Sequence, residues 1–356
     1  MSRPRIVVLA QPFKESLSSP QVAAALAAAV QSAGGDPVVV LGSDGGDGLL
    51  DALESCCVGW TSYQVADPLL RSVTVRVGWL DGGTAVVESR LSCGLGLLQP
   101  SERTPQDTST RGVGQLIDAA VRDGATRVFV GLGGSATMDA GMGMARTWGW
   151  LPLDANGAVL DEGGGALARV ARLAVGQGPA ADLVGLCDVA NPLTGTRGAR
   201  VYAGQKGATA PGEQMLAAGL ERLAACLPGG KELACRAGAG AAGGLGFGLA
   251  AFGRGSLVPG AAWVLERVGL EQALSGAALV VVGEGSFDQT SLEGKLTGVA
   301  LSRTRQLGIH AVLVAPQASG VPDDVTLATG GSWWDAAELE RRAARALGSA
   351  LRLLGS

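Results

Sequence analysis

The sequence predicts an α/β fold in two domains: a Rossmann-like domain with a parallel sheet, interrupted by an inserted α/β domain with a mixed sheet. Strand and helix patterns alternate at both ends of the chain, as they do in doubly wound sheets. The middle of the chain instead carries a hairpin pattern. A length of 356 residues is sufficient for two domains.

The N-terminal end alternates between the two kinds of element. A short apolar run at residues 6–10 predicts a buried strand, and a Ser-Pro start predicts a helix over residues 19–33. A second strand is expected at residues 37–41, followed by a glycine-rich turn and a helix within residues 44–56. A third strand near residues 61–65 completes a βαβαβ pattern.

The C-terminal end repeats this pattern. Strands are expected at residues 277–283 and 311–315, with a further strand at 325–329. Helices are expected at residues 297–307 and 335–351.

Right-handed crossovers allow both ends of the chain to build a single parallel sheet. We therefore expect a discontinuous domain of residues 1–66 and 277–356, with an inserted domain at residues 67–276. The inserted part is expected to contain a hairpin of strands 73–77 and 84–88, a helix after Thr110, strands 127–131 and 183–187, and a helix at 213–226.

Composition excludes several classes of function. The chain carries 28 Lys and Arg against 32 Asp and Glu, a formal charge of −4, and only 4% aromatic residues. Because a basic face and stacking platforms are lacking, we expect no nucleic-acid partner. The single histidine, His310, nearly excludes Ser-His-Asp, Cys-His and multi-histidine metal chemistry.

Neither the cysteines nor the apolar segments indicate secretion or a membrane. The six cysteines include no CxxC pair, which is typical of reduced thiols packed as small hydrophobic residues. The uncharged run at residues 237–253 contains seven glycines, so it would make a poor membrane-spanning helix. We expect a soluble, cytoplasmic protein without a membrane partner. A homodimer is a possible oligomeric state.

Two glycine-rich or charged segments near the N-terminus are candidate anion sites. Lys14 follows the first strand, at the edge where α/β folds bind ligands. The segment Asp44-Gly-Gly-Asp-Gly48 precedes a helix, whose free amides favour anions. The structural alternatives are a solvated lysine and an aspartate that only caps the helix.

A third candidate is the strand-to-helix turn at residues 131–139. Gly133 and Gly134 can offer backbone amides to phosphate oxygens. Ser135 and Thr137 can add hydroxyls, and Asp139 can bind Mg²⁺ or a hydroxyl. The alternative is a glycine-rich turn with Asp139 in the first turn of a helix.

The fourth candidate follows the strand at residues 277–283. Glu284 and Asp288 come directly after this buried strand, where carboxylates need a partner, a metal ion or water, and Lys295 lies just beyond them. Turn capping is the alternative for a single aspartate in such a place. Asp188 ends another strand, Asn191 and the proline after it make a rigid turn, and Lys206 adds a second cation downstream.

One motif favours a different class of protein. Residues 238–243 fit the pattern GxGxxG, which keeps a nicotinamide-dependent oxidoreductase open as an alternative. That alternative requires a strand directly before Gly238, and residues 231–236 are not a clean buried strand. Acids, lysines and glycine-rich anion cradles without imidazole instead favour phosphoryl transfer.

In their order, these segments resemble the motifs of bacterial type I glycerate kinases, the glycerate 2-kinase family. The resemblance implies ATP-dependent, Mg²⁺-assisted phosphorylation of D-glycerate, usually to 2-phosphoglycerate. It also implies two α/β domains with the site in the cleft between them. Its seven collinear segments nearly span the chain: residues 14–18, 44–48, 133–139, 187–193, 205–207, 238–244 and 283–295.

From this resemblance we expect Asp188 or Asp288 to orient and deprotonate the substrate hydroxyl, and which of them holds Mg²⁺ stays open. Arg90 or Arg111 is expected to pair with the substrate carboxylate. The remaining expected site residues are Lys14 as a catalytic cation, Lys206, Ser135, Thr137, Asn191, Lys295, Gly133 and Gly134 for substrate and phosphate, and Asp139 and Glu284 for the metal.

Several positions depart from the family pattern. Ser286 stands where the family has an arginine, and Met138 stands in place of an asparagine. The segment Glu88-Ser-Arg-Leu-Ser-Cys93 replaces Glu-Met-Ala-x-Ala-Ser, and Ala10-Gln-Pro12 replaces Pro-Asp-Ser. These departures keep two alternatives open: a different small hydroxy acid as substrate, or a catalytically silent relative that binds a metabolite.

Overall fold

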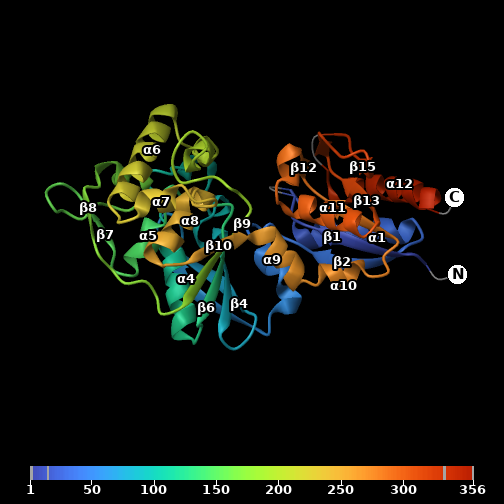
Figure 1. Cartoon of the computed structure of the whole chain (residues 1–356), viewed down its shortest axis with the longest axis horizontal. Coiled ribbons are helices and arrows are strands. Elements are labelled where there is room, and N and C mark those ends of the chain that lie inside the picture. The colour runs from blue at the N-terminus through green and yellow to red at the C-terminus, as the bar shows by residue number, and fades with distance from the viewer. Residues whose placement is uncertain (1–2, 14–15, 332–333, 355–356) are drawn as a thin grey trace. The chain divides into compact units, whose positions relative to one another are not determined.

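The computed structural model describes residues 3–13, 16–331 and 334–354 (Figure 1). Contacts within the chain divide it into two compact units. Unit 1 comprises residues 1–44, 51–56 and 260–356, and unit 2 comprises residues 45–50 and 57–259. Each unit has its own central sheet.

Unit 1 is built on a five-stranded, fully parallel sheet with the order β15-β13-β11-β1-β2. Its central strands are uninterrupted apolar runs, which suits strands that are buried on both faces. Strand β1 lies between β2 and β11. The strand that follows β1 in sequence therefore pairs with one edge of it, and the C-terminal strands extend the sheet from the other edge, which makes the β1/β11 boundary a topological switch point. The strands are β1 (Arg5–Ala10), β2 (Asp36–Leu41), β11 (Leu279–Gly283), β13 (His310–Val314) and β15 (Val325–Ala328).

Helices cover both faces of this sheet. Alternation along β1 sends Ile6 and Val8 toward one face, where they pack with α1 and α12, and Val7 and Leu9 toward the other. Helix α1 (Ser19–Ser32) is capped by Ser18, one residue before the predicted start. The other helices are α9 (Gly260–Arg267), α10 (Leu270–Leu274), α11 (Leu296–Gln306) and α12 (Ala336–Leu354), with short elements β12 (Ser286–Phe287), η7 (Gln289–Leu292) and β14 (Gln317–Ala318).

Unit 2 is built on a six-stranded mixed sheet with the order β10-β9-β6-β5-β4-β3. Strands β5, β6, β9 and β10 are parallel, whereas β3 and β4 are antiparallel to their neighbours. The strands are β3 (Gly59–Ala66), β4 (Ser72–Trp79), β5 (Thr84–Glu88), β6 (Arg127–Gly131), β9 (Asp182–Cys187) and β10 (Ser256–Pro259).

The strand expected at residues 61–65 is present, but the prediction that it continues the N-terminal parallel sheet was wrong. It forms β3, the antiparallel edge strand of the unit 2 sheet, paired along its whole length with β4. Its residues Thr61 to Gln64 are exposed or half-buried, which an edge strand tolerates and a central parallel strand does not. The tight turn at residues 67–71 joins β3 and β4 as a hairpin.

Helices and short turns complete unit 2. Helix α4 (Arg111–Arg122) follows Thr110 as expected. The remaining elements are α3 (Arg90–Cys93), α5 (Met142–Arg146), α6 (Ala210–Ala225), α7 (Gly230–Ala234), α8 (Ala241–Phe252), the hairpin of β7 (Leu151–Leu153) and β8 (Arg172–Ala174), and the 3₁₀ turns η2 (Leu95–Leu97), η3 (Pro100–Glu102), η4 (Gly164–Arg169), η5 (Ala199–Tyr202) and η6 (Gly204–Lys206). The short elements α2 (Leu49–Ala52) and η1 (Glu54–Cys56) fill the chain between β2 and β3.

The α/β class, with one parallel and one mixed sheet, is confirmed. The domain limits of 1–66 with 277–356 and of 67–276 stay a prediction. Within residues 3–13, 16–331 and 334–354, no helix is both long and apolar enough to cross a membrane.

Candidate active site

Three parallel strands of unit 2 end side by side and lead into polar segments. Strands β5, β6 and β9 are in register, so that Glu88 lies opposite Gly131 and Gly131 opposite Leu186. Arg90 follows β5, the glycine-rich turn follows β6, and Asp188 follows β9. The carboxyl edge of this sheet therefore gathers three of the predicted segments, at the place where α/β folds bind ligands.

The glycine-rich turn packs closely against the loop at residues 45–50. A side chain at Gly133 would bring its Cβ within 2.9 Å of the Cα of Gly46, and one at Gly131 within 2.6 Å of the carbonyl oxygen of Gly45. Real Cβ atoms do not approach so closely, so these glycines are required for the two backbones to touch. The glycines of both segments therefore have a shared structural role, whereas the sequence suggested two separate anion sites.

Glu88 clamps the loop at residues 45–50 to strand β5. Its carboxylate accepts hydrogen bonds from the backbone N–H of Gly48 and of Leu50, both at 3.0 Å, and from Nε of Arg90 at 2.6 Å. The side chain is only 3% exposed, and this burial raises the pKa of Glu88 while Arg90 and the two amides oppose the shift. Sequence reasoning missed this clamp, although an acid at the end of a buried strand was a signal for it.

The two arginines expected at the substrate carboxylate have different surroundings. Arg90 lies at the glycine-rich turn, 39% exposed, between Glu88 and Asp47, whose Oδ1 is 3.7 Å from its Nε. Arg111 instead forms an ion pair with Glu162, with its Nε at 2.9 Å, and Ser109 also donates to that carboxylate. Arg111 therefore serves to fix residues 109–111 to residue 162, and Arg90 is the better placed of the two.

The carboxylate of Asp139 already accepts four hydrogen bonds from the chain. Its Oδ2 accepts from the backbone N–H and hydroxyl of Thr110 and from the N–H of Gly143, and its Oδ1 accepts from the N–H of Gly141. The residue is fully buried, and that burial raises its pKa. The geometry gives Asp139 a structural role, because its carboxylate joins the start of α4 to the start of α5, and its expected role as a magnesium ligand stays a prediction.

Lys206 and the glycine-rich turn are brought together across 71 residues of sequence. Its Nζ donates to Ser135 Oγ at 2.7 Å and to the carbonyl oxygen of Thr137 at 2.8 Å. Burial lowers the pKa of Lys206 to about 8. The hydroxyl of Thr137 is buried and has no hydrogen-bond partner in the part of the chain that the structure describes.

After β9, Asn191 shapes the loop that carries Asp188. Its side chain donates to the carbonyl oxygen of Arg197 at 2.7 Å and accepts from the hydroxyl of Tyr202 at 3.0 Å. Asp188 is half-buried, and its charge adds to burial in raising the pKa of the neighbouring Cys187 thiol to about 11. The side chain of Asn191 therefore holds this loop in shape.

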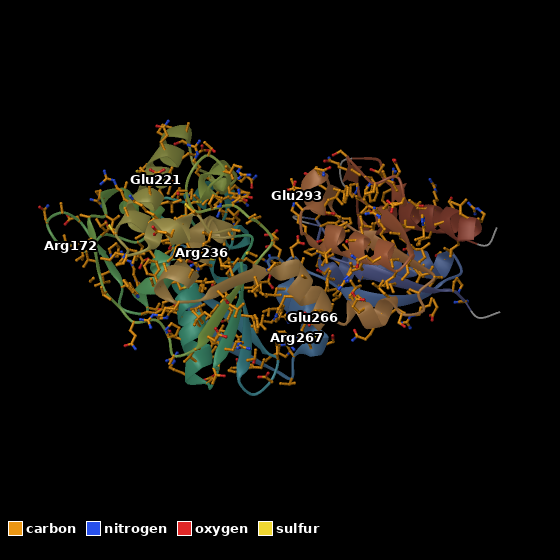
Figure 2. The ribbon with its side chains drawn as sticks, in the orientation of Figure 1. Arg172, Glu221, Arg236, Glu266, Arg267 and Glu293 are labelled. Atoms are coloured by element: carbon orange, nitrogen blue, oxygen red, sulfur yellow. The ribbon has the colours of Figure 1, made fainter. Side chains whose placement is uncertain are left out.

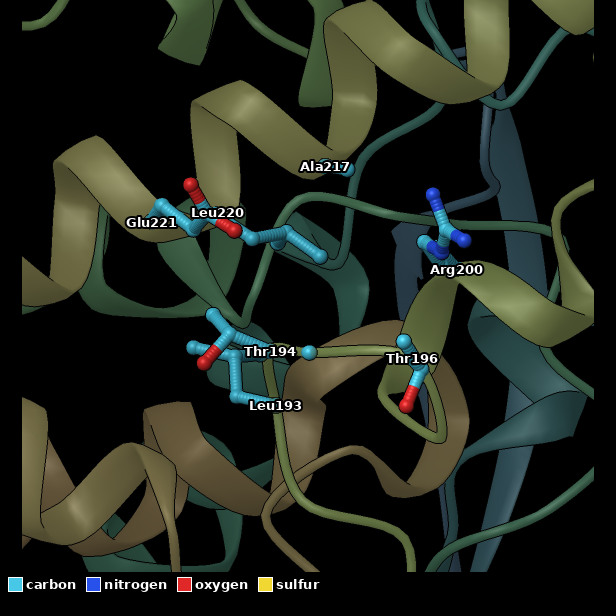
Figure 3. Close-up of a pocket in the computed structure, with 8 residues that line it drawn as sticks. Leu193, Thr194, Thr196, Arg200, Ala217, Leu220 and Glu221 are labelled. Carbon is cyan, nitrogen blue, oxygen red and sulfur yellow. The ribbon is translucent and has the colours of Figure 1, made fainter.

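A small pocket lies beyond this loop, against helix α6. It has a volume of about 230 Å³, with Thr194, Thr196 and Arg200 on the loop side and Glu221 on the helix side (Figure 3). None of the predicted site residues lines it. The pocket is therefore adjacent to the candidate site in sequence without being part of it.

In unit 1, the carboxyl edge at the β1/β11 switch point carries a buried polar cluster. Gln11, after β1, donates to the hydroxyl of Thr297 at 3.0 Å, and Ser291 donates to Oε1 of Glu284 at 2.9 Å. Oε2 of Glu284, in a residue that is 9% exposed, is buried without a well-aligned hydrogen-bond donor among the described residues. Burial raises the pKa of Glu284, hydrogen bonds from the Thr297 and Ser291 hydroxyls oppose the shift, and the nearby charge of Asp44 adds to it.

Asp44 caps helix α11, 252 residues further along the chain. Its Oδ1 accepts from the backbone N–H of Leu296 at 2.5 Å, at the first residue of α11. The expected alternative was a cap on the helix that directly follows residue 48. This contact brings the end of the β2 loop to the start of α11, beside the Glu284 cluster.

Asp288 is exposed and is held by its own turn. Its Oδ1 accepts from the backbone N–H of Thr290 at 2.7 Å and from the Thr290 hydroxyl at 2.6 Å, and these bonds lower its pKa. Nζ of Lys295 donates to the same hydroxyl at 2.8 Å. Lys14 lies outside the described residues. Charged side chains away from the strand edges, such as Glu293 and Arg236, are exposed (Figure 2).

The GxGxxG segment lacks the strand that dinucleotide binding requires. Helix α7 (Gly230–Ala234) and a short turn precede Gly238. This finding contradicts the nicotinamide-dependent alternative, because that motif depends on a strand that leads directly into the glycine-rich turn. The segment instead packs against the turn at residues 131–139, as Gly243 shows: its Cβ would lie 1.8 Å from the Thr137 carbonyl oxygen.

Comparisons with known proteins agree on one family. The sequence profile of the glycerate kinase family matches residues 6–354. A glycerate kinase of Bacillus subtilis (strain 168) is 37% identical over 310 residues, which cover 82% of this chain and 79% of that protein. The glycerate 2-kinase of Escherichia coli (strain K12) is 35% identical over 316 residues, covering 83% and 81%.

A solved structure resembles the whole chain. The crystal structure of a protein assigned as glycerate kinase 2, from Salmonella typhimurium LT2, matches with a TM-score of 0.77 and 29% sequence identity. The match covers 99% of this chain and 98% of that one. Fold and sequence therefore point to the same family.

Proposed function

The chain belongs to the glycerate kinase family and is a kinase, and from this premise we propose that it transfers the γ-phosphoryl group of ATP to the 2-hydroxyl of D-glycerate with the help of Mg²⁺. The observation that carries the proposal is the family match over residues 6–354, because it includes every polar segment at the two strand edges. Phosphoryl transfer needs positioning and charge stabilisation, and those segments offer carboxylates, cations and glycine-rich backbone.

Asp188 is the proposed general base. It follows β9 at the same sheet edge as Arg90 and the glycine-rich turn. Asp288 is a weaker candidate, because two hydrogen bonds from Thr290 stabilise its ionised form and lower its pKa. We therefore assign Asp188 to accept the proton of the substrate hydroxyl, and Asp288 to hold the turn beside Lys295.

Arg90 is the proposed partner of the substrate carboxylate. Glu88 already fixes its guanidinium through Nε, which limits the freedom that binding would otherwise remove. This arginine stands where the family pattern has an alanine, and Ser286 stands where the family has an arginine. These two departures keep another small hydroxy acid as the second candidate substrate.

The glycine-rich turn is proposed to receive phosphate oxygens. Gly133 and Gly134 form its accessible part, with Ser135 buried directly behind them. In unit 1, Lys14 and Lys295 are proposed as further cations for phosphate oxygens. Asn191 is proposed to act through the shape of the loop after β9, since both ends of its amide are in use.

Glu284 fits a magnesium ion better than Asp139 does. A buried carboxylate is costly unless a proton, a donor or a cation compensates its charge. Among the described residues, Oε2 of Glu284 accepts no well-aligned hydrogen bond, and the Thr297 hydroxyl nearby stabilises the ionised carboxylate only in part. Asp44 adds a second negative charge nearby. A magnesium ion held there would neutralise charge on the phosphates.

A coupled assay of ADP release tests the proposal, with D-glycerate, L-glycerate and other small hydroxy acids as acceptors. We expect turnover with D-glycerate that depends on Mg²⁺, and phosphorus NMR should identify 2-phosphoglycerate rather than 3-phosphoglycerate. Faster turnover of another hydroxy acid would support the second candidate. Absence of turnover with every acceptor would reject both.

A further inference from the structure

Lys206 is too deeply enclosed to meet a ligand directly. It is 5% exposed, and its ammonium group donates to Ser135 Oγ and to the Thr137 carbonyl oxygen. A lysine that binds an external anion normally keeps its charged end open to solvent. Both hydrogen bonds of Nζ instead go to the two ends of the segment at residues 135–137, behind the exposed Gly134.

Two glycines build this enclosure. Gly207, directly after Lys206, has a φ of +97°, and a Cβ there would lie 2.0 Å from the Arg103 carbonyl oxygen. Gly243 has a φ of +68°, and a Cβ there would lie 1.8 Å from the Thr137 carbonyl oxygen and 3.1 Å from Lys206 Nζ. The segment at residues 241–244 therefore closes over the ammonium group only because it lacks a side chain at Gly243.

Backbone strain in the segment at residues 241–244 also indicates that this segment encloses Lys206. Ala242 has a φ of +52°, a left-handed conformation that costs a residue other than glycine about 1 kcal/mol. The fold tolerates this conformation directly beside the glycine that admits Lys206. The glycine-rich segment, which lacks the strand for a dinucleotide, thus has a structural role, because it seals a lysine behind the turn.

The charge of Lys206 has little direct compensation. The titratable groups that face it are the Cys93 thiol and the Asp139 carboxyl, and burial raises the pKa of both, that of Cys93 to about 12. Among the described residues no ion pair includes Lys206. Its ammonium therefore depends on the two oxygen acceptors of the turn, and the turn depends on the ammonium.

We propose that Lys206 is a positioning residue for phosphoryl transfer: it acts through the Ser135 hydroxyl and the Thr137 carbonyl to fix the turn at residues 133–137, without touching the phosphate itself. The inference rests on the proposed role of that turn. It replaces the direct phosphate contact that the sequence suggested for Lys206. It also explains why the Lys206 ammonium is buried behind the glycine-rich turn rather than exposed where that turn would bind phosphate.

A double-mutant cycle tests the inference. Ser135→Ala, Lys206→Met and the double variant are compared in KM for ATP, kcat and thermal melting, with the exposed Lys231→Met as the matched control. Each single change should raise KM for ATP about tenfold, and the double change should add less than a factor of three, because both remove the same support. If the two effects multiply instead, so that KM for ATP rises about a hundredfold in the double variant, Lys206 contacts the phosphate independently of Ser135 and the proposal is overturned.

A second measurement does not require Lys206→Met to fold. Burial lowers the pKa of Lys206 to about 8, so the wild-type KM for ATP should rise as the pH passes 8 and the ammonium loses its charge. In Ser135→Ala this rise should be at least halved, since one of the two routes from the ammonium to the turn is gone. An unchanged rise in Ser135→Ala would contradict the proposal.

Failure of the proposed function would look different. If wild-type protein does not turn over D-glycerate, the same variants and pH series are read from calorimetric binding of ATP to the full chain. Coupling between Ser135 and Lys206 in that readout would support the positioning role even with another acceptor. Independent effects in an active enzyme would reject the positioning role alone.

Discussion

The carboxylate of Glu88 accepts a hydrogen bond of 2.6 Å from Nε of Arg90, two residues further along the chain. The same carboxylate accepts the backbone N–H groups of Gly48 and Leu50, from a loop some forty residues earlier. One buried acid therefore orients the arginine that is proposed to bind the substrate carboxylate, and it also anchors a neighbouring loop. The first two predictions follow from this arrangement.

Glu88→Ala should lower the stability of the protein. The change leaves two backbone donors and a guanidinium without their buried acceptor, which is expected to cost about 2–4 kcal/mol of unfolding free energy. Urea unfolding measures the loss, and the exposed Glu266→Ala serves as the control. A midpoint shift no larger than that of the control would show that Glu88 does not clamp the loop.

Arg90→Ala and Arg111→Ala should have different effects. Loss of Arg90 removes a charge-assisted contact of about 1.5–3 kcal/mol and should raise KM for D-glycerate roughly 10–100-fold. Loss of Arg111 removes the nearer of the two arginines that pair with the half-buried Glu162 and leaves only Arg146, at 3.7 Å, so it should lower the melting temperature more than it changes KM. Steady-state kinetics and thermal melting of both variants check this, and the reverse pattern would assign the substrate carboxylate to Arg111.

Asp188→Asn should lower kcat by about 10²–10⁴, because the proposed general base is lost. Asp288→Asn should have an effect below tenfold, since Thr290 already holds that carboxylate in its ionised form. The exposed Asp323→Asn is the control for loss of an acid. A larger loss of kcat in Asp288→Asn than in Asp188→Asn would transfer the role of base to Asp288.

Glu284→Gln should stabilise the protein at neutral pH in the absence of metal ions. The folded-state pKa of Glu284 is raised above 4.5, so the folded protein binds the proton more tightly than the unfolded chain. Its contribution to stability is therefore full below pH 4.5 and is lost as the pH rises through the folded-state pKa. This loss should be absent in Glu284→Gln, as urea unfolding between pH 4 and 8 can measure.

Metal binding is a second test of Glu284, in which the substitution that stabilises the metal-free protein should weaken its affinity for the ion. Mn²⁺, followed by electron paramagnetic resonance as a substitute for Mg²⁺, should bind the wild-type chain and bind Glu284→Gln at least tenfold more weakly. Asp139→Asn should leave Mn²⁺ binding unchanged while it lowers stability, because that carboxylate only receives hydrogen bonds from the chain. Equal Mn²⁺ affinity in wild type and Glu284→Gln would remove Glu284 from the metal site.

Local sequence determined most of the individual elements. Uninterrupted apolar runs such as those of β1 and β11 are typical of strands buried on both faces of a parallel sheet, and glycines and prolines mark where helices begin and end. The positions of the polar segments at the strand ends could likewise be read locally, because the carboxyl ends of parallel strands are where α/β folds bind ligands. The order of these segments was sufficient to indicate the family.

Tertiary structure decided which of those polar groups are available. Nothing near Asp139 in sequence reveals that Thr110 occupies its carboxylate, nor does the sequence around Arg111 point to Glu162. The sheet to which residues 59–66 belong was settled by pairing with β4, since a half-buried pattern fits either sheet. Contacts of this kind depend on close packing between segments that are distant in sequence. A local sequence pattern does not show which distant residue a side chain will contact.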